Sequence, residues 1–269
     1  MTTHAATADD AIRVLDALHN ANPLVHCMTN IVVAGFTANV LLAIGASPAM
    51  VENAEESAEF AAIADALLVN LGTLSPDKVS AMRLAVAAAN SAGTPWVLDP
   101  VAVGALGYRT GFASSLLSES PRVIRGNASE ILSLAGVAGM AGRGVDSTAD
   151  SQSAFASASD FARRQGSVVA LSGAVDYITD GSQAIEVKTG HQIMTRVTGV
   201  GCALGALIAA CVAVEPASLI AASAGTTILT VAAEVAVKES RGAGSFAVEL
   251  IDALYKLDES TIRNHVREN

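Results

Sequence analysis

Aromatic residues, cysteines and charged residues are all scarce in this chain of 269 residues. Aromatics make up only 4% of it, so its core must be built mainly from Ala, Val, Leu and Ile. Charged residues make up 16% and apolar residues 51%, which excludes a disordered chain, because disorder requires low hydrophobicity and high charge. The net charge of -10 argues against a nucleic-acid partner, which requires a basic face. It does not exclude a nucleotide substrate, because one phosphate chain needs only local donors.

The three cysteines, Cys27, Cys202 and Cys211, do not form a disulfide framework, because their number is odd and their spacing irregular. The sequence contains no CxxC pair and no Cys/His cluster, so nothing predicts a zinc site. The first ten residues lack the basic start and apolar core of a signal peptide. We therefore expect a cytoplasmic protein with one domain over residues 1–269, of which residues 1–10 form a flexible segment.

Two long runs lack charged residues altogether. Residues 197–214 carry no charge over a length that a transmembrane helix needs, and a second uncharged run follows Glu215. Both runs are rich in Ala, Gly, Ser and Thr rather than Leu and Phe, so their membrane insertion would be poorly favoured. The better interpretation is a pair of helices buried inside a soluble protein, without a membrane partner.

Short apolar strands alternate with helical patterns along most of the chain, which is typical of a parallel sheet covered on both faces. The expected strands are residues 24–29, 66–70, 96–99, 122–125 and 167–171. The expected helices are residues 31–44 with Thr29 or Asn30 as the N-cap, 76–90, 128–134 and 154–164. A hairpin over residues 175–188 then turns at Asp180-Gly181, and the chain is helical from Gly199 onward. The sequence thus predicts an α/β fold with a mostly parallel central sheet, late antiparallel strands and C-terminal helices.

Polar residues close several of the apolar runs. In open α/β sheets, ligands bind beyond the carboxyl ends of the strands, so these polar residues are expected to form a shared rim. They are Thr29, Asn30, Asn70, Asp99, Arg125, Asn127, Ser172 and Gly173.

The segment Thr198-Gly-Val-Gly-Cys202 is the strongest chemical signal, because it directly precedes a long apolar helix. Gly199 and Gly201 let the backbone approach a ligand closely, and the helix start offers free N–H groups for a phosphate or a developing negative charge. In the first turn, Cys202 is expected to have a lowered pKa and to take a proton from an alcohol. The alternative is close helix packing by small residues. The segment is neither a Walker loop nor a dinucleotide fingerprint.

Two carboxylate segments add a second signal, each with a structural alternative. Asn127 and Glu130 have the spacing of a capping box; alternatively, Glu130 holds magnesium through water while Arg125 faces the nucleotide phosphates. Asp99, followed by Pro100, is either a turn former or a carboxylate on the metal and phosphate side.

Taken together, these segments resemble the hydroxyethylthiazole kinase family. The resemblance runs in order over nearly the whole chain, and the loop that ends in Cys202 is its most specific part, since the wider ribokinase-like superfamily usually has Asp there. The matching stretches are His26-Cys-Met-Thr-Asn30, Gly45-Ala-Ser-Pro-Ala-Met50, Leu98-Asp-Pro-Val-Ala-Val-Gly104, Ile124-Arg-Gly-Asn-Ala-Ser-Glu130 and Val197-Thr-Gly-Val-Gly-Cys202.

The resemblance implies a ribokinase-like fold and the ATP-dependent phosphorylation of 4-methyl-5-(2-hydroxyethyl)thiazole, a salvage step toward thiamine. It also implies magnesium, and a homotrimer with active sites at the subunit interfaces. The family pattern assigns the residues as follows: Met50, Gly199 and Asn30 at the thiazole; Arg125, Ser172, Asn127 and Thr198 at ATP; Asp99 and Glu130 at the metal; Cys202 with Gly199 and Gly201 at the catalytic position.

Two positions depart from the family pattern. Val200 stands where Thr is frequent, and Ser172 stands where Thr is common but keeps the hydroxyl.

Two other functions stay open. The first alternative function is another ribokinase-like kinase, acting on a hydroxymethylpyrimidine or a sugar alcohol. The second is a non-catalytic protein that binds a nucleotide or a thiazole.

Overall fold

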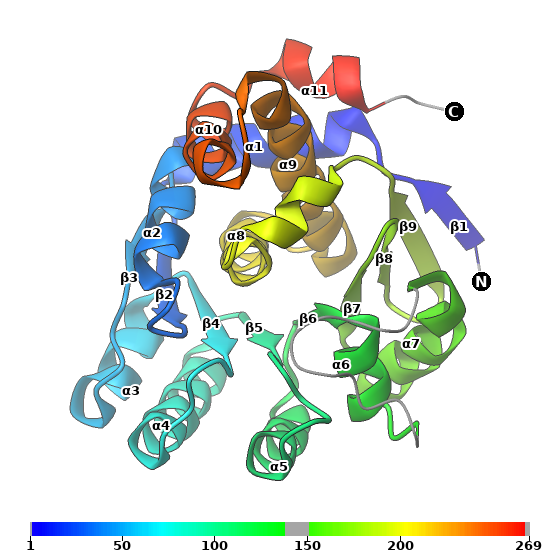
Figure 1. The fold of residues 1–269 in the computed structure, drawn as a ribbon. Helices are drawn as coiled ribbons and strands as arrows, with labels where there is room; N and C mark the ends of the chain where they lie inside the picture. Colours follow the sequence, from blue (N-terminus) through cyan, green and yellow to red (C-terminus); the bar gives the residue numbers. More distant parts are fainter. Residues whose placement is uncertain (1, 138–150, 267–269) are drawn as a thin grey trace.

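A single nine-stranded sheet organises the chain (Figure 1). The computed structural model describes residues 2–137 and 151–266. Across the sheet the strand order is β1-β9-β8-β7-β6-β5-β4-β2-β3. The strands are β1 (Thr2–Ala5), β2 (Leu24–Met28), β3 (Ser47–Ala49), β4 (Ala66–Asn70), β5 (Trp96–Asp99), β6 (Val123–Asn127), β7 (Val168–Ser172), β8 (Asp176–Thr179) and β9 (Gln183–Val187).

The direction of the strands confirms the expected mostly parallel sheet. From β3 to β7 every neighbouring pair is parallel, and β8 is antiparallel to both β7 and β9. Five adjacent strands, β2, β4, β5, β6 and β7, therefore end at the same edge of the sheet. Their buried, apolar residues explain why they occupy its centre, since a parallel strand is covered on both faces.

Helices cover both faces of the sheet and enclose two hydrophobic cores (Figure 1). Helices α1, α2, α8, α9, α10 and α11 pack on one face, and α3 to α7 pack on the other. The α-helices are α1 (Ala8–Ala21), α2 (Ala34–Ala43), α3 (Ala54–Ile63), α4 (Pro76–Ala92), α5 (Gly107–Leu116), α6 (Ala128–Leu134), α7 (Ser151–Gln165), α8 (Val200–Val214), α9 (Ser218–Glu239), α10 (Ala243–Tyr255) and α11 (Glu259–His265), with short 3-10 helices at Leu117–Glu119 and Gln192–Arg196.

The N-terminal segment differs from the sequence prediction. Residues 1–10 were expected to be flexible, whereas Thr2–Ala5 forms β1, which pairs in parallel with β9, and α1 begins at Ala8. Thr7 caps that helix by accepting a hydrogen bond from the backbone N–H of Asp10. All four residues of β1 are exposed, so the strand is held by backbone pairing at the sheet edge rather than by an apolar pattern.

Helix α2 begins later than the sequence indicates. The prediction of a helix from residue 31 with Thr29 or Asn30 as its cap is wrong, because α2 starts at Ala34 after a turn. The side chain of Asn30 is occupied elsewhere, as a donor to Asn70 and Cys202. The backbone N–H of Ile31 donates to the Thr73 hydroxyl instead of entering a helix. Asn30 and Ile31 therefore bond to residues near the strand ends and do not belong to α2.

The two uncharged runs form α8 and α9, as predicted, and both lie inside the molecule. Helix α9 is long and apolar enough to cross a membrane by composition, but 78% of its apolar window is buried in the structure. Helix α8 packs over β2, β4 and β5, which brings its N-terminus to the strand-end edge.

Candidate active site

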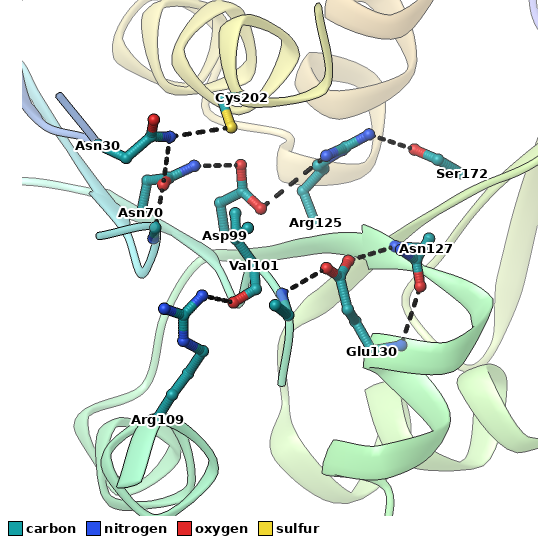
Figure 2. Close-up of polar contacts among 12 residues, drawn as sticks. Asn30, Asn70, Asp99, Val101, Arg109, Arg125, Asn127, Glu130, Ser172 and Cys202 are labelled. Atoms are coloured by element: carbon teal, nitrogen blue, oxygen red, sulfur yellow. Dashed lines mark hydrogen bonds and ion pairs between the residues drawn. The ribbon is translucent and has the colours of Figure 1, made fainter. Parts of the chain in front are cut away.

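The polar residues predicted to form a shared rim do come together at the carboxyl ends of the central strands (Figure 2). Asn70, Asp99, Asn127 and Ser172 are the last residues of β4, β5, β6 and β7, and Asn30 lies two residues beyond β2. Because these strands are parallel neighbours, five segments that are distant in sequence deliver their side chains to one edge.

The glycine loop approaches this edge from the α8 side. Gly199 is the N-cap of α8 with φ +94°, and a Cβ there would lie 2.6 Å from Cγ1 of Val33. A Cβ on Gly201 would lie 2.9 Å from Nη1 of Arg125. Only glycine satisfies the backbone angle and the space at Gly199. The loop therefore places the unpaired N–H groups of the helix start beside the rim.

A chain of side-chain hydrogen bonds connects Cys202 to Asp99. Asn30 Nδ2 donates to Cys202 Sγ at 3.3 Å and also to Asn70 Oδ1 at 3.3 Å. Asn70 Nδ2 then donates to Asp99 Oδ2 at 2.7 Å. Asn70 and Asp99 are fully buried and are register partners in β4 and β5, so their side chains lie on the same face of the sheet.

The expected lowering of the Cys202 pKa is wrong. Burial, reinforced by the negative charge of Asp99, raises the pKa of the Cys202 thiol to about 11. Hydrogen bonds from Asn70 and Asn30 and the positive charge of Arg125 oppose that rise without reversing it. Near neutral pH the side chain is therefore a thiol rather than a thiolate.

Asp99 and Arg125 form the charged centre of the site. Burial raises the pKa of Asp99 to about 7, with Glu130 adding to the rise and Arg125 and Asn70 opposing it. Arg125 Nη1 lies 3.9 Å from Asp99 Oδ1, and its Nη2 donates to the hydroxyl of Ser172 at 3.0 Å. Asp99 Oδ1 has no hydrogen-bond partner within residues 2–137 and 151–266. One carboxylate oxygen is thus fixed by Asn70, and the other remains able to accept.

The Asn127–Glu130 segment is a capping box. The Asn127 side chain accepts from the N–H of Glu130 at 3.0 Å, and Glu130 Oε2 accepts from the N–H of Asn127 at 2.9 Å. Glu130 Oε1 accepts from the N–H of Ala102 at 2.8 Å. Burial raises the pKa of Glu130, while these two backbone donors act against it. The structural alternative is confirmed, and the same carboxylate also lies close enough to Asp99 to affect its pKa.

The loop after β5 holds Glu130 from the other side. Ala102 has φ +59°, an unusual angle for a residue other than glycine, and this turns its N–H toward the carboxylate. Arg109, from α5, donates to the carbonyl of Val101 at 2.7 Å (Figure 2). Asp99 and Glu130 thereby belong to one connected arrangement.

The residues present fit a magnesium ion that arrives with a nucleotide. Magnesium favours carboxylate oxygens and keeps several of its waters. Among the described residues, Asp99 has a buried oxygen without a hydrogen bond, and each oxygen of Glu130 accepts one N–H. Within the described ranges, no group of three or more His, Cys, Asp or Glu side chains could hold a metal ion by itself. The donor set suits an ion shared with phosphates.

Two of the sequence-predicted residues lie apart from the polar network. Met50 is half-buried after β3 and packs against the hydrophobic core that contains α8. Thr198 is exposed at the start of the glycine loop. Asn70 was expected in the shared rim, because it closes an apolar run as Asp99 does, but without a specific role. Neither Ala102 nor Arg109 was predicted to take part in the site.

Comparison with known proteins identifies close relatives over nearly the full chain. Residues 15–260 match the model of the Hydroxyethylthiazole kinase family. A relative named hydroxyethylthiazole kinase, from Granulibacter bethesdensis, is 54% identical over 256 residues, which cover 95% of this chain and 93% of the relative.

Solved structures agree with the observed fold. A structure of a hydroxyethylthiazole kinase protein from Pyrococcus horikoshii has a TM-score of 0.89 at 39% identity, covering 96% of this chain and 98% of that one. A ribokinase-like superfamily protein from Enterococcus faecalis has a TM-score of 0.67 at 13% identity, covering 96% and 97%. The second likeness concerns the fold alone, and it supports the ribokinase-like architecture.

Proposed function

Because the chain belongs to the hydroxyethylthiazole kinase family, we propose that this site transfers the γ-phosphoryl group of ATP to the primary alcohol of 4-methyl-5-(2-hydroxyethyl)thiazole. The chain is a phosphotransferase of thiamine salvage. The observation that carries the site assignment is the start of α8, where the glycine loop ends on Cys202 above the Asn30–Asn70–Asp99 chain.

The backbone of the glycine loop stabilises the moving phosphoryl group. In the reaction the substrate oxygen forms a bond to phosphorus, the bond to the bridging oxygen of ATP breaks, ADP leaves and the hydroxyl proton is released. Phosphoryl transfer depends on positioning and charge stabilisation more than on covalent help from the protein. The N–H groups of Gly199, Gly201 and Cys202 supply this stabilisation at the positive end of α8.

The ATP side of the site is assigned to Arg125, Ser172, Asn127 and Thr198. Arg125 presents a planar fork that suits phosphate oxygens, and its bond to Ser172 fixes the direction of that fork. Asn127 lies at the end of β6 and Thr198 at the exposed approach to the loop.

The thiazole side is assigned to Met50, Gly199 and Asn30, and a neighbouring subunit completes it. Ile31 and Val32, directly after Asn30, are 76% and 64% exposed, although both are large apolar residues. Exposed apolar residues at the mouth of a site mark a contact surface. This supports a homotrimer with active sites at the subunit interfaces. We also propose a cytoplasmic location, in keeping with the burial of α9 in the core.

Asp99 and Glu130 would hold magnesium, directly or through water. Bound there, the ion would offset the negative charge of the β- and γ-phosphates. Asn70 and the backbone N–H groups of Ala102 and Asn127 hold the two carboxylates in fixed directions beforehand.

Cys202 orients the substrate hydroxyl rather than removing its proton before transfer. With its pKa raised to about 11, the thiol is protonated near neutral pH. A loose transition state for phosphoryl transfer needs little help from a base, so a neutral side chain can serve this position.

Thiazole-dependent release of ADP tests the proposed function. The wild-type chain, assayed with saturating ATP and magnesium, is expected to release ADP only when the thiazole alcohol is present, and the alcohol should gain one phosphoryl group by mass. Hydroxymethylpyrimidine and a sugar alcohol serve as competing substrates. Equal turnover of all three, or none with the thiazole alcohol, would refute the assignment.

The variant Cys202→Ala separates the role of the thiol from packing. We expect a large loss in kcat with the KM for the thiazole alcohol changed by less than about threefold, since an interaction made mainly in the transition state affects kcat rather than KM. Equal losses in substrate binding and turnover would indicate a packing role instead.

A further inference from the structure

Asn70 is the central member of the polar chain and is fully buried. Its Oδ1 accepts from the backbone N–H of Gly72 at 3.0 Å and from Asn30 Nδ2 at 3.3 Å, and its Nδ2 donates to Asp99 Oδ2 at 2.7 Å. A backbone N–H can only donate, so the end of the Asn70 amide that faces Gly72 must be its oxygen. The Gly72 N–H therefore fixes the orientation of the amide and directs its NH2 group toward Asp99.

The orientation of the Asn70 amide also fixes the orientation of the Asn30 amide. Since Oδ1 of Asn70 is an acceptor, Asn30 must present its Nδ2 to it, and the same Nδ2 reaches Cys202 Sγ at 3.3 Å. The sulfur thus accepts a hydrogen bond, which leaves its own hydrogen directed away from Asn30. A Cβ on Gly72 would lie 2.6 Å from Cβ of Asn30, so glycine is required there for Asn30 to approach.

Helix α8 packs closely against the side chain of Asp99. A Cβ on Gly205 would lie 3.1 Å from Asp99 Oδ2, the oxygen that Asn70 binds. With Oδ2 fixed between Asn70 and α8, Oδ1 is the oxygen left toward Arg125. The orientation of one amide therefore determines the directions of both Asp99 and Cys202.

We propose that Asn70 is a positioning residue for phosphoryl transfer: its amide, oriented by the Gly72 N–H, fixes one oxygen of Asp99 and makes Cys202 Sγ a hydrogen-bond acceptor. Asn70 acts through its neighbours and not on the substrate. The inference rests on the proposed kinase function and adds to it a residue whose effect falls on turnover rather than on binding.

The test compares Asn70→Leu with a matched asparagine far from the site. Asn70→Leu keeps the branched shape and the number of side-chain heavy atoms but removes all three hydrogen bonds, and one lost bond to a charged group corresponds to a fall in kcat of roughly 10- to 100-fold. The KM values for ATP and the thiazole alcohol should change by less than about threefold. Asn90→Leu is the control, because Asn90 bonds to Trp96 and Glu119 at the opposite end of β5. It should lower Tm and leave kcat unchanged.

Asn70→Ala covers the case in which the leucine variant does not fold. This variant also removes all three hydrogen bonds but adds no volume to the buried site, so the same loss in kcat is expected. A kcat within about threefold of wild type in a folded Asn70 variant, or a parallel rise in both KM values, would overturn the inference. An inactive wild-type chain would instead count against the proposed function itself, so the two failures are distinguishable.

Discussion

At the scale of single residues, burial of the Asp99 carboxyl group has an electrostatic cost. Its side chain is fully buried, with Arg125 Nη1 at 3.9 Å from one oxygen. Because its pKa is raised to about 7, the folded chain retains a proton over a pH range in which the unfolded chain has already released it. The stability that Asp99 contributes is therefore complete below its unfolded pKa of about 4 and is lost as the pH rises to about 7.

Asp99→Asn is consequently expected to stabilise the protein at high pH while abolishing its activity. The amide keeps an acceptor for Asn70 and removes the buried charge, and each unit of pKa shift corresponds to about 1.4 kcal/mol. The Tm of the variant minus that of wild type should rise by several degrees between pH 4.5 and pH 8.5, as measured by calorimetry without nucleotide.

Asp77→Asn is the control for this experiment, because Asp77 is exposed in the first turn of α4. Its Tm difference from wild type should change less with pH than that of Asp99→Asn, because an exposed charge is not desolvated. A pH-independent difference for Asp99→Asn would show that burial of the Asp99 charge has no net cost.

The chemistry of individual residues was only partly predictable. Asp99 could be identified because it follows a short apolar run, and Glu130 because it stands three residues after Asn127; both are local features of the sequence. The pKa of Cys202 could not, because it depends on burial and on Asp99, which is distant in sequence. The position of Cys202 at the N-terminus of a helix, taken alone, predicts a lowered pKa.

At the scale of elements, the turn into α8 depends on Gly199. Its φ is +94°, and a Cβ added there would lie only 2.6 Å from Cγ1 of Val33, which leaves no room for a side chain. Gly199→Ala combines backbone strain of roughly 1–2 kcal/mol with displacement of the loop. Both Tm and kcat should fall, as measured by thermal unfolding and steady-state turnover.

Gly93→Ala provides a matched comparison for that prediction. Gly93 ends α4 with φ +79°, and a Cβ there would have nothing within 4 Å. The variant should lose stability through backbone strain alone, with kcat unchanged. Equal kcat in the two variants would mean that the shape of the glycine loop does not matter for turnover.

Elements with a strong local signal were predicted to within a few residues. β5 and α6 match their predicted ranges, and α4 begins at Pro76 as expected. The start of α2 was missed, because a capping residue and a site residue have the same chemistry, and only the fold shows that Asn30 bonds to Cys202, 172 positions away. β1 was missed because its exposed residues carry no apolar pattern and its partner β9 is far along the chain.

At the scale of the whole molecule, the proposed trimer predicts that association and activity are linked. The chain has a mass of 27.2 kDa, and light scattering should give a mass about three times as large. Ile31→Asp places a charge on the exposed apolar pair beside Asn30, so it should weaken association and lower turnover together.

Leu84→Asp is the comparison, since Leu84 is also an exposed apolar residue but lies on α4, away from the Asn30 turn. It should leave both mass and turnover unchanged. A monomeric wild type with full activity, or a fully active Ile31→Asp monomer, would contradict the interface proposal.

The parallel arrangement of the central strands also places the candidate site at one end of these strands and leaves the other end free of it. Every segment that enters β2, β4, β5, β6 or β7 arrives at the edge opposite the chemistry, while every segment that leaves them contributes to it. The turn at Gly93 and Thr94 is one such entry, with open space around Gly93. For anyone who wishes to attach a dye, an affinity tag or a fusion partner, this rear edge is the attachment face that leaves the catalytic edge unobstructed.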